Sequence, residues 1–309
     1  MNHTTTPSAP SPKKATSAAD LYSFDLAANC TLVKLSASQF SGRKKDEALA
    51  ADVARDNNGD TDAYETFLKV LPDETRKAIQ QIVTEARTYY KLHTTPWDTG
   101  WALVNNTIYE KLRSDLEEFG IKFMEAVQTE VLDKRDQLAD LSDARLGKRA
   151  YLYPFPELEA LRGEYEFNVK TMPIPNPKDL RLKHVSPDVA KQIEAETTQL
   201  LNDKLKGAMT TVVSRIRSVV ERVFDTLNDG DKIFRDSMIQ NVKDLCAVIP
   251  ELNLTNDRFI SQVADEIMTT LGNVDCKKVR EDPEERKAVA VKAGSLLDRL
   301  KNVKLADNL

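Results

Sequence analysis

The sequence predicts a mainly α-helical protein with a small β element. We expect a long antiparallel helical hairpin that carries a β-hairpin at its tip, followed by a C-terminal helical region. Composition is the first observation behind this prediction. Aromatic residues are only 6% of the 309 residues, and glycine (10) and proline (13) are scarce, which favours helices over low-complexity chain. The second is periodicity, because apolar residues repeat with helical spacing over two long segments and alternate strictly between them.

Each of the two long segments has one apolar face. The first is predicted to be helical over residues 106–138, because its apolar side chains lie three and four residues apart. The second, over residues 187–227, contains a heptad seam formed by Leu205, Met209, Val212, Ile216, Val219 and Val223. In an antiparallel hairpin each helix would bury the stripe of the other. An intermolecular coiled coil has the same pattern, so the seam alone leaves a homo-oligomer open.

The chain between the two long helices has the clearest strand pattern. Tyr165, Phe167 and Val169 alternate with polar residues, and residues 180–182 predict a second strand after a proline-containing loop. Paired with each other, these strands would form the β-hairpin at the tip. A similar alternation predicts a further strand over residues 31–37, which would join this β element.

Start and stop signals mark the shorter helices. Pro72, followed by two acidic residues, is typical of a helix N-terminus, and Asp282 opens a capping box. These signals and the apolar periodicity predict helices over residues 45–55, 72–93, 156–162, 233–249, 255–271 (capped by Thr255) and 282–303. Pro250 is expected to end the helix that precedes it. The segment that contains Trp97 and Trp101 is expected to be a loop.

The chain is expected to have three parts. Residues 1–20 offer almost nothing to bury and are predicted to be a disordered tail. Residues 21–228 are expected to form an α-helical body, and residues 229–309 a C-terminal helical region packed on it. No apolar run is long enough to span a membrane. The three cysteines lie far apart in sequence, which favours a reducing, cytoplasmic compartment over a disulfide framework.

Motifs for catalysis, cofactors or metals are missing from the sequence. The three histidines, His3, His93 and His184, have neither the spacing of metal ligands nor a cysteine nearby. Residues 56–65 are acidic like a calcium loop, but Thr61 stands where such loops require glycine. The chain contains neither a P-loop nor a G-x-G-x-x-G motif. We therefore expect a protein that is not an enzyme and that has no cofactor.

Three consecutive cations form the one candidate binding site. Arg43, Lys44 and Lys45 follow Ser41-Gly42 at a predicted strand-to-helix turn, where helical N–H groups would also face an anion. They are possible contacts to an anion or to nucleic acid. Against this, the chain has 49 acidic and 44 basic residues, and no aromatic residue is interleaved with the cations. Solvated surface cations are therefore the favoured interpretation.

Several short segments occur in a recognisable order along the chain: Leu32–Ser36, Ser41–Asp46, Glu85–Arg87, Tyr153–Leu158, the strand around Phe167, Phe234–Ser237 and Leu252–Thr255. Together they resemble a bacteriophage protein family known only as a domain of unknown function. The resemblance covers residues 29–270, with Phe40 where the family more often has tryptophan. It implies a phage or prophage origin and a gene that often lies beside those of a MoxR-type AAA+ ATPase and a von Willebrand factor A-domain protein. It supplies no catalytic residues.

The expected function is that of a non-enzymatic, phage-encoded helical interaction protein in the cytoplasm of the infected bacterial host. The resemblance implies the partners, so that the protein would be an adaptor or client of the MoxR-type AAA+ ATPase and its A-domain partner. One alternative is a DNA-associated phage protein, end-protecting or nuclease-blocking, that uses Arg43, Lys44 and Lys45. Another is a structural component of the virion.

Overall fold

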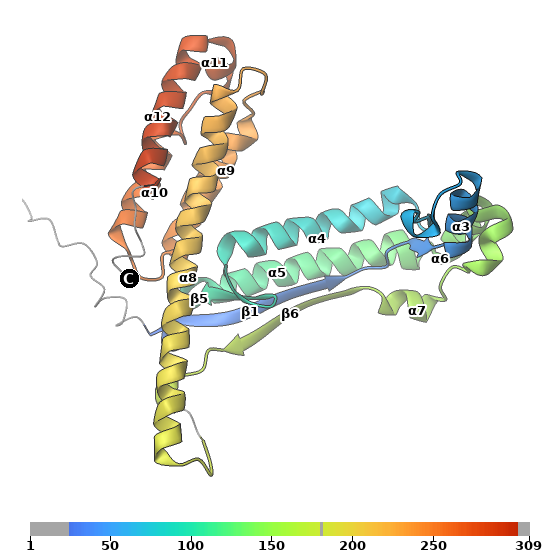
Figure 1. Ribbon diagram of the computed structural model, residues 1–309, viewed down its shortest axis with the longest axis horizontal. Coiled ribbons are helices and arrows are strands. Elements are labelled where there is room, and N and C mark those ends of the chain that lie inside the picture. Colours follow the sequence, from blue (N-terminus) through green and yellow to red (C-terminus); the bar gives the residue numbers. More distant parts are fainter. Residues whose placement is uncertain (1–24, 180–181, 302–309) are drawn as a thin grey trace, which may run out of the picture. The chain divides into compact units, whose positions relative to one another are not determined.

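The computed structural model describes residues 25–179 and 182–301 (Figure 1). The chain forms two compact units, each assembled from separate stretches of sequence. Among the described residues, the first contains 25–32, Leu92–Ile108, 172–179 and 182–301, and the second contains Val33–Lys91 and Tyr109–Thr171. Each unit has its own hydrophobic core. The tail predicted for residues 1–20 lies outside the described residues.

The first unit is a group of helices around one very long helix. Its elements are α2 (Leu26–Asn29), β4 (Thr95–Asp98), β5 (Trp101–Asn105), the 3-10 turn η4 (Pro177–Asp179), α8 (Pro187–Asn228), α9 (Asp236–Leu252), α10 (Arg258–Thr270), α11 (Cys276–Glu281) and α12 (Pro283–Lys301). Helix α8 packs along α12 and against α9, and α10 packs against α9 (Figure 1). The buried side chains of α8 begin at Leu201 and continue to Leu227.

The two ends of α8 have different partners. At its start the Ser186 side chain accepts a hydrogen bond from the backbone N–H of Val189, and Pro187 occupies the first turn, as the free N–H groups of a helix N-terminus favour. At its other end the guanidinium of Arg286 donates to the carbonyl oxygens of Thr226 and Leu227. Carbonyls in the last turn of a helix have no partner within the helix, so this α12 side chain satisfies them.

The second unit consists of two helices with smaller elements at one end. The elements that lie wholly or mostly in it are β2 (Arg43–Lys45), α3 (Glu47–Asp56), η1 (Thr61–Ala63), β3 (Phe67–Lys69), α4 (Asp73–His93), α5 (Asn106–Val127), the π-helical turn η2 (Gln128–Leu132), α6 (Arg135–Leu146), the 3-10 helix η3 (Gly147–Leu152) and α7 (Leu158–Gly163). Phe123 is completely buried in its core, and its ring lies 6.3 Å from that of Tyr165 and 5.7 Å from that of Phe167.

Two sheets are present in the described part of the chain. A four-stranded antiparallel sheet has the order β4-β5-β1-β6, in which β1 is Cys30–Ser38 and β6 is Glu166–Pro173. Its β4–β5 hairpin pairs Thr95 with Leu103 and has an irregular register between Pro96 and Asp98. The second sheet is a ribbon of β2 and β3.

The predicted helical hairpin with a β-hairpin at its tip is wrong, although the mainly helical class is confirmed. The apolar stripe of α8 is covered by α12 and α9, and α5 belongs to the other unit. Strand β6 lies beside β1 in the four-stranded sheet. Of the predicted second strand, residues 180–181 lie outside the described residues and Leu182 is not in a strand. An apolar stripe requires a partner but does not identify it, so the periodicity could not select α12.

Most other predicted elements are confirmed, with shifted ends. Helices α4 and α8 and strands β1 and β6 lie within a few residues of their predicted positions. The long helix from residue 106 is interrupted by η2 and continues as α6, while α9 continues through Pro250 to Leu252. Asp257, rather than Thr255, caps α10. Among the helices of the described residues, none combines the length and the apolar character needed to cross a bilayer.

Candidate functional site

The three predicted cations form strand β2 of the two-stranded ribbon rather than a turn. Strand β2 pairs antiparallel with β3, with Arg43 opposite Lys69 and Lys45 opposite Phe67. Residues directly opposite each other, and residues two apart along a strand, share one face of a sheet. Arg43, Lys45, Phe67 and Lys69 therefore lie on one face, which we call the ribbon face.

The ribbon face is exposed, and the opposite face has the half-buried Leu68 and the exposed Lys44. All four of its residues are exposed, and the Phe67 side chain is 51% accessible. On the opposite face Leu68 is half-buried, and the ammonium group of Lys44 lies 5.8 Å from the centre of the Phe40 ring. Phe40 is itself buried in the core. The ribbon thus separates Lys44 from the other two predicted contacts.

Two carboxylates accompany the cations of the ribbon face. Lys45 Nζ lies 3.2 Å from Glu65 Oε1, and Lys69 Nζ lies 2.6 Å from Asp73 Oδ2. The hydrogen bond from Lys69 holds the pKa of Asp73 below its ordinary value. All four side chains are more than a third exposed, and ion pairs of this kind contribute only about 0–1 kcal/mol. Arg43 has no ion-pair partner among the described residues.

A glycine turn places β2 against β3. Gly42 has a φ of +62°, in the left-handed region that favours glycine. Its carbonyl oxygen accepts hydrogen bonds from the backbone N–H groups of Val70 and Leu71. A Cβ atom at this position would lie 2.4 Å from the Cβ of Leu71, so only glycine allows this close approach. The Ser41-Gly42 sequence therefore determines where the cationic strand begins.

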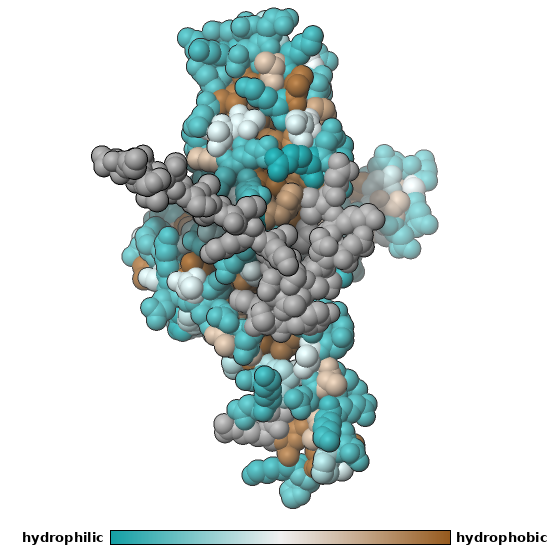
Figure 2. All heavy atoms as spheres, turned by 90° about the vertical axis from the view of Figure 1, so that its left-hand side faces the viewer, coloured by the Kyte–Doolittle hydropathy of each residue, from teal (hydrophilic) through white to brown (hydrophobic). Residues whose placement is uncertain are grey.

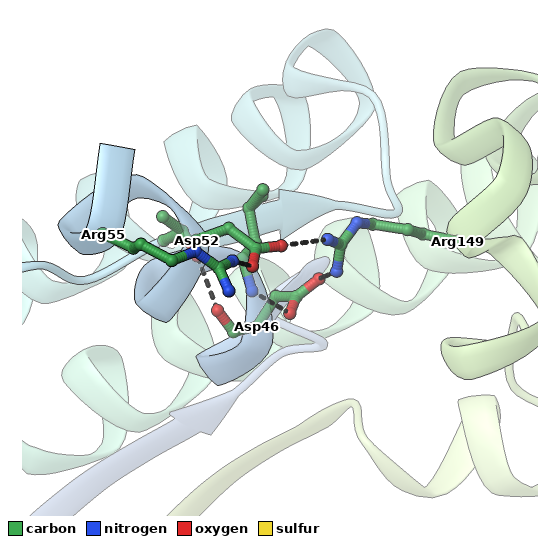
Figure 3. Close-up of polar contacts among 6 residues, drawn as sticks. Asp46, Asp52, Arg55 and Arg149 are labelled. Carbon is green, nitrogen blue, oxygen red and sulfur yellow. Dashed lines mark hydrogen bonds and ion pairs between the residues drawn. The ribbon is translucent and has the colours of Figure 1, made fainter. Parts of the chain in front are cut away.

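A buried ion pair fixes the chain where β2 ends and α3 begins. The Asp46 side chain, 1% exposed, accepts a hydrogen bond from the backbone N–H of Leu49 and caps α3. Its second oxygen accepts from Arg149 Nη1 at 2.7 Å, and Arg149 Nη2 lies 3.4 Å from Asp52 (Figure 3). Asp52 also pairs with Arg55. Because Arg149 comes from η3, this contact joins two distant stretches of sequence within the second unit.

The start of α8, residues 187–200, is a second candidate site, which we call the arm. None of its side chains is buried, in contrast to the chain from Leu201 onward. Val189, Ile193 and Leu200 lie four and seven residues apart, so they share one stripe of the helix. Val189 is 46% and Leu200 48% exposed. Figure 2 shows apolar surface among hydrophilic side chains where α8 begins, at the bottom of the view.

Metal-ligating side chains and free thiols are the remaining candidates for chemistry among the described residues. No group of three or more His, Cys, Asp or Glu side chains among them is arranged to hold a metal ion. Burial raises the pKa of the Cys30 thiol to about 12 and that of Cys246 to about 11. Thiols with raised pKa values are protonated at neutral pH and are poor nucleophiles.

Sequence reasoning located the cations but missed two members of the ribbon face. Arg43 and Lys45 share this face, while Lys44 points the other way. Phe67 and Lys69 were not predicted as site residues, and Phe67 supplies the aromatic side chain that the sequence did not place beside the cations. The sequence has no clear signal for them, because Phe67 and Leu68 are both apolar; the alternation of exposed and half-buried residues appears only once Phe67–Lys69 pairs with 43–45.

The chain matches no family model, no curated protein and no solved structure. The resemblance to the phage family is therefore still a prediction.

Proposed function

We propose that this protein is a non-enzymatic interaction protein, an adaptor or client of a MoxR-type AAA+ ATPase and its A-domain partner in the infected bacterial cell. The arm is the docking element. The observation that carries this proposal is an apolar stripe on a helix segment without buried residues, in which Val189 and Leu200 are exposed and Ile193 is half-buried. An amphipathic helix that offers such a stripe typically binds in an apolar groove of a partner protein.

The charges beside the stripe indicate the kind of groove. Asp188, Glu194 and Glu196 on the arm are exposed, against one exposed cation, Lys191. Charges at the rim of an interface set orientation and selectivity through complementarity. We therefore expect the partner's groove to be apolar at its floor and basic at its rim. We assign this groove to the ATPase, with the A-domain protein as its companion in the assembly.

The test is binding of the full-length protein to the purified ATPase and A-domain protein by biolayer interferometry. The variant Val189→Glu/Leu200→Glu removes the apolar stripe at exposed positions, so it should fold normally. We expect its affinity for the ATPase to fall at least tenfold, because a loss of about 1.4 kcal/mol in binding free energy raises the Kd tenfold. The matched control is Val291→Glu on α12, where the side chain is 67% exposed.

The control variant should bind as the unchanged protein does. Absence of binding to both partners would overturn the proposal. Equal affinity of the double variant would overturn the role of the arm. A virion component would instead be found in purified particles and would not bind the ATPase.

A further inference from the structure

The ribbon face combines positive charge with an exposed aromatic ring. Arg43 and Lys45 are two residues apart on one strand, which places their Cα atoms about 6.7 Å apart. Phe67 is directly opposite Lys45, and Lys69 is directly opposite Arg43. Phe67 is a large apolar residue, yet it is 51% exposed. A ligand for this face must therefore offer both negative charge and a flat apolar surface.

Unpaired nucleotides have this combination. Proteins that bind single strands use cations along the phosphate backbone and aromatic side chains on which bases stack. In a duplex each base is already stacked between its neighbours, so an exposed ring on a short ribbon has no free base to contact. Simple phosphates would use the cations and leave the ring without a role.

We propose that the ribbon face binds single-stranded nucleic acid, with Arg43 and Lys45 on phosphates and Phe67 stacked on a base. Glu65 and Asp73 compete for Lys45 and Lys69. Phosphates can displace them, because exposed ion pairs are weak. Lys44 takes no part, since its ammonium group lies over the Phe40 ring on the opposite face.

The experiment is a fluorescence anisotropy titration of the full-length protein with labelled dT20 over a series of salt concentrations. Phe67→Ala should weaken binding by about 5- to 150-fold, the effect of losing one stacked base. Phe67→Tyr keeps the ring and should restore the affinity. Arg43→Gln/Lys45→Gln should flatten the log–log salt dependence by about 1.4 units, at about 0.7 per phosphate for single strands.

Two controls make the proposal falsifiable. Lys44→Gln removes one charge from the opposite face of the same strand and should leave affinity and salt dependence unchanged. A duplex of the same length should bind more weakly than dT20. The proposal is overturned by no binding of dT20 at 50 mM salt, by equal binding of the duplex, or by a Phe67→Ala variant that binds like the unchanged protein. Circular dichroism confirms that each variant is folded.

Discussion

Arg149 Nη1 lies 2.7 Å from Oδ2 of Asp46, a carboxylate whose side chain is only 1% exposed. Asp46 follows β2 directly and caps α3, while Arg149 comes from η3, about a hundred residues later. The pair therefore holds the end of the cationic strand against a distant part of the second unit. A charge buried this deeply is costly without its partner.

The first prediction is that Asp46 and Arg149 are energetically coupled. Arg149→Met leaves the buried carboxylate without its cation and should lower the free energy of unfolding by about 2–3 kcal/mol. This loss is no larger than the smallest losses expected for a fully buried ion pair, because the Arg149 side chain is 30% exposed. Asp46→Asn keeps a capping oxygen but removes the charge. Urea denaturation of both single variants and the double variant should give a coupling energy of about 1–3 kcal/mol. Additive effects would mean that the pair has no structural role.

The second prediction concerns the turn that positions β2. Gly42→Ala should destabilise the protein by about 1–3 kcal/mol, because the new Cβ would meet Leu71 and the positive φ is strained for alanine. The matched control is Gly163→Ala, where a Cβ would have no neighbour within 4 Å. Thermal denaturation followed by circular dichroism measures both. Equal melting temperatures for the two variants would contradict the close packing of Gly42.

The third prediction tests whether the α8 seam is buried within the chain. Ile216 is 1% exposed in the core of the first unit, so Ile216→Ala should cost about 2–5 kcal/mol. Trp97 and Trp101 pack against this core, and their fluorescence reports its unfolding in denaturant. Ser214→Ala, at an exposed position of the same helix, is the control. A seam that is buried only in a dimer would instead give a monomeric variant by light scattering with little change in the monomer's stability.

The fourth prediction follows from the buried thiol of Cys30. Burial raises its pKa from 9.0 to about 12, so the folded protein favours the protonated form. This contribution to stability is fully present below pH 9 and falls as pH rises through 9 toward 12, by about 1.4 kcal/mol per pH unit. Cys30→Ala should therefore show a shallower loss of stability between pH 9 and 10.5. Parallel pH profiles of the two proteins would show that the thiol titrates normally.

The elements were easier to predict from the sequence than their partners. Residues 205–223 identify a buried helical stripe wherever its partner lies, so the helices α8 and α12 could each be predicted but their packing against each other could not. The β4–β5 hairpin was missed because Pro96 and the irregular register near Asp98 break its alternation. Pro250 has no N–H to donate, but α9 continues for two more residues because Ile249 and Leu252 are both buried. Tertiary packing outweighs the local signal there.

The candidate site was predictable only in part for a similar reason. Three consecutive cations are visible in the sequence, but which of them share a face depends on whether they form a turn or a strand. Pairing with β3 decides this and brings Phe67 beside Lys45. The ion pair of Asp46 depends on Arg149, which lies about a hundred residues later in the sequence. No local pattern in the sequence indicates a contact over that separation.

Cross-linking mass spectrometry in infected cells tests the central claim, docking through the arm, most directly. Lys191 on the arm and Lys292 on α12 are both exposed and provide a site and a control for amine cross-links. We predict that Lys191 links to the AAA+ ATPase, that nuclease treatment leaves the link intact, and that Val189→Glu/Leu200→Glu abolishes it while links from Lys292 are unchanged. Cross-links to the ATPase that persist in the double variant, or none at all from Lys191, would contradict the account.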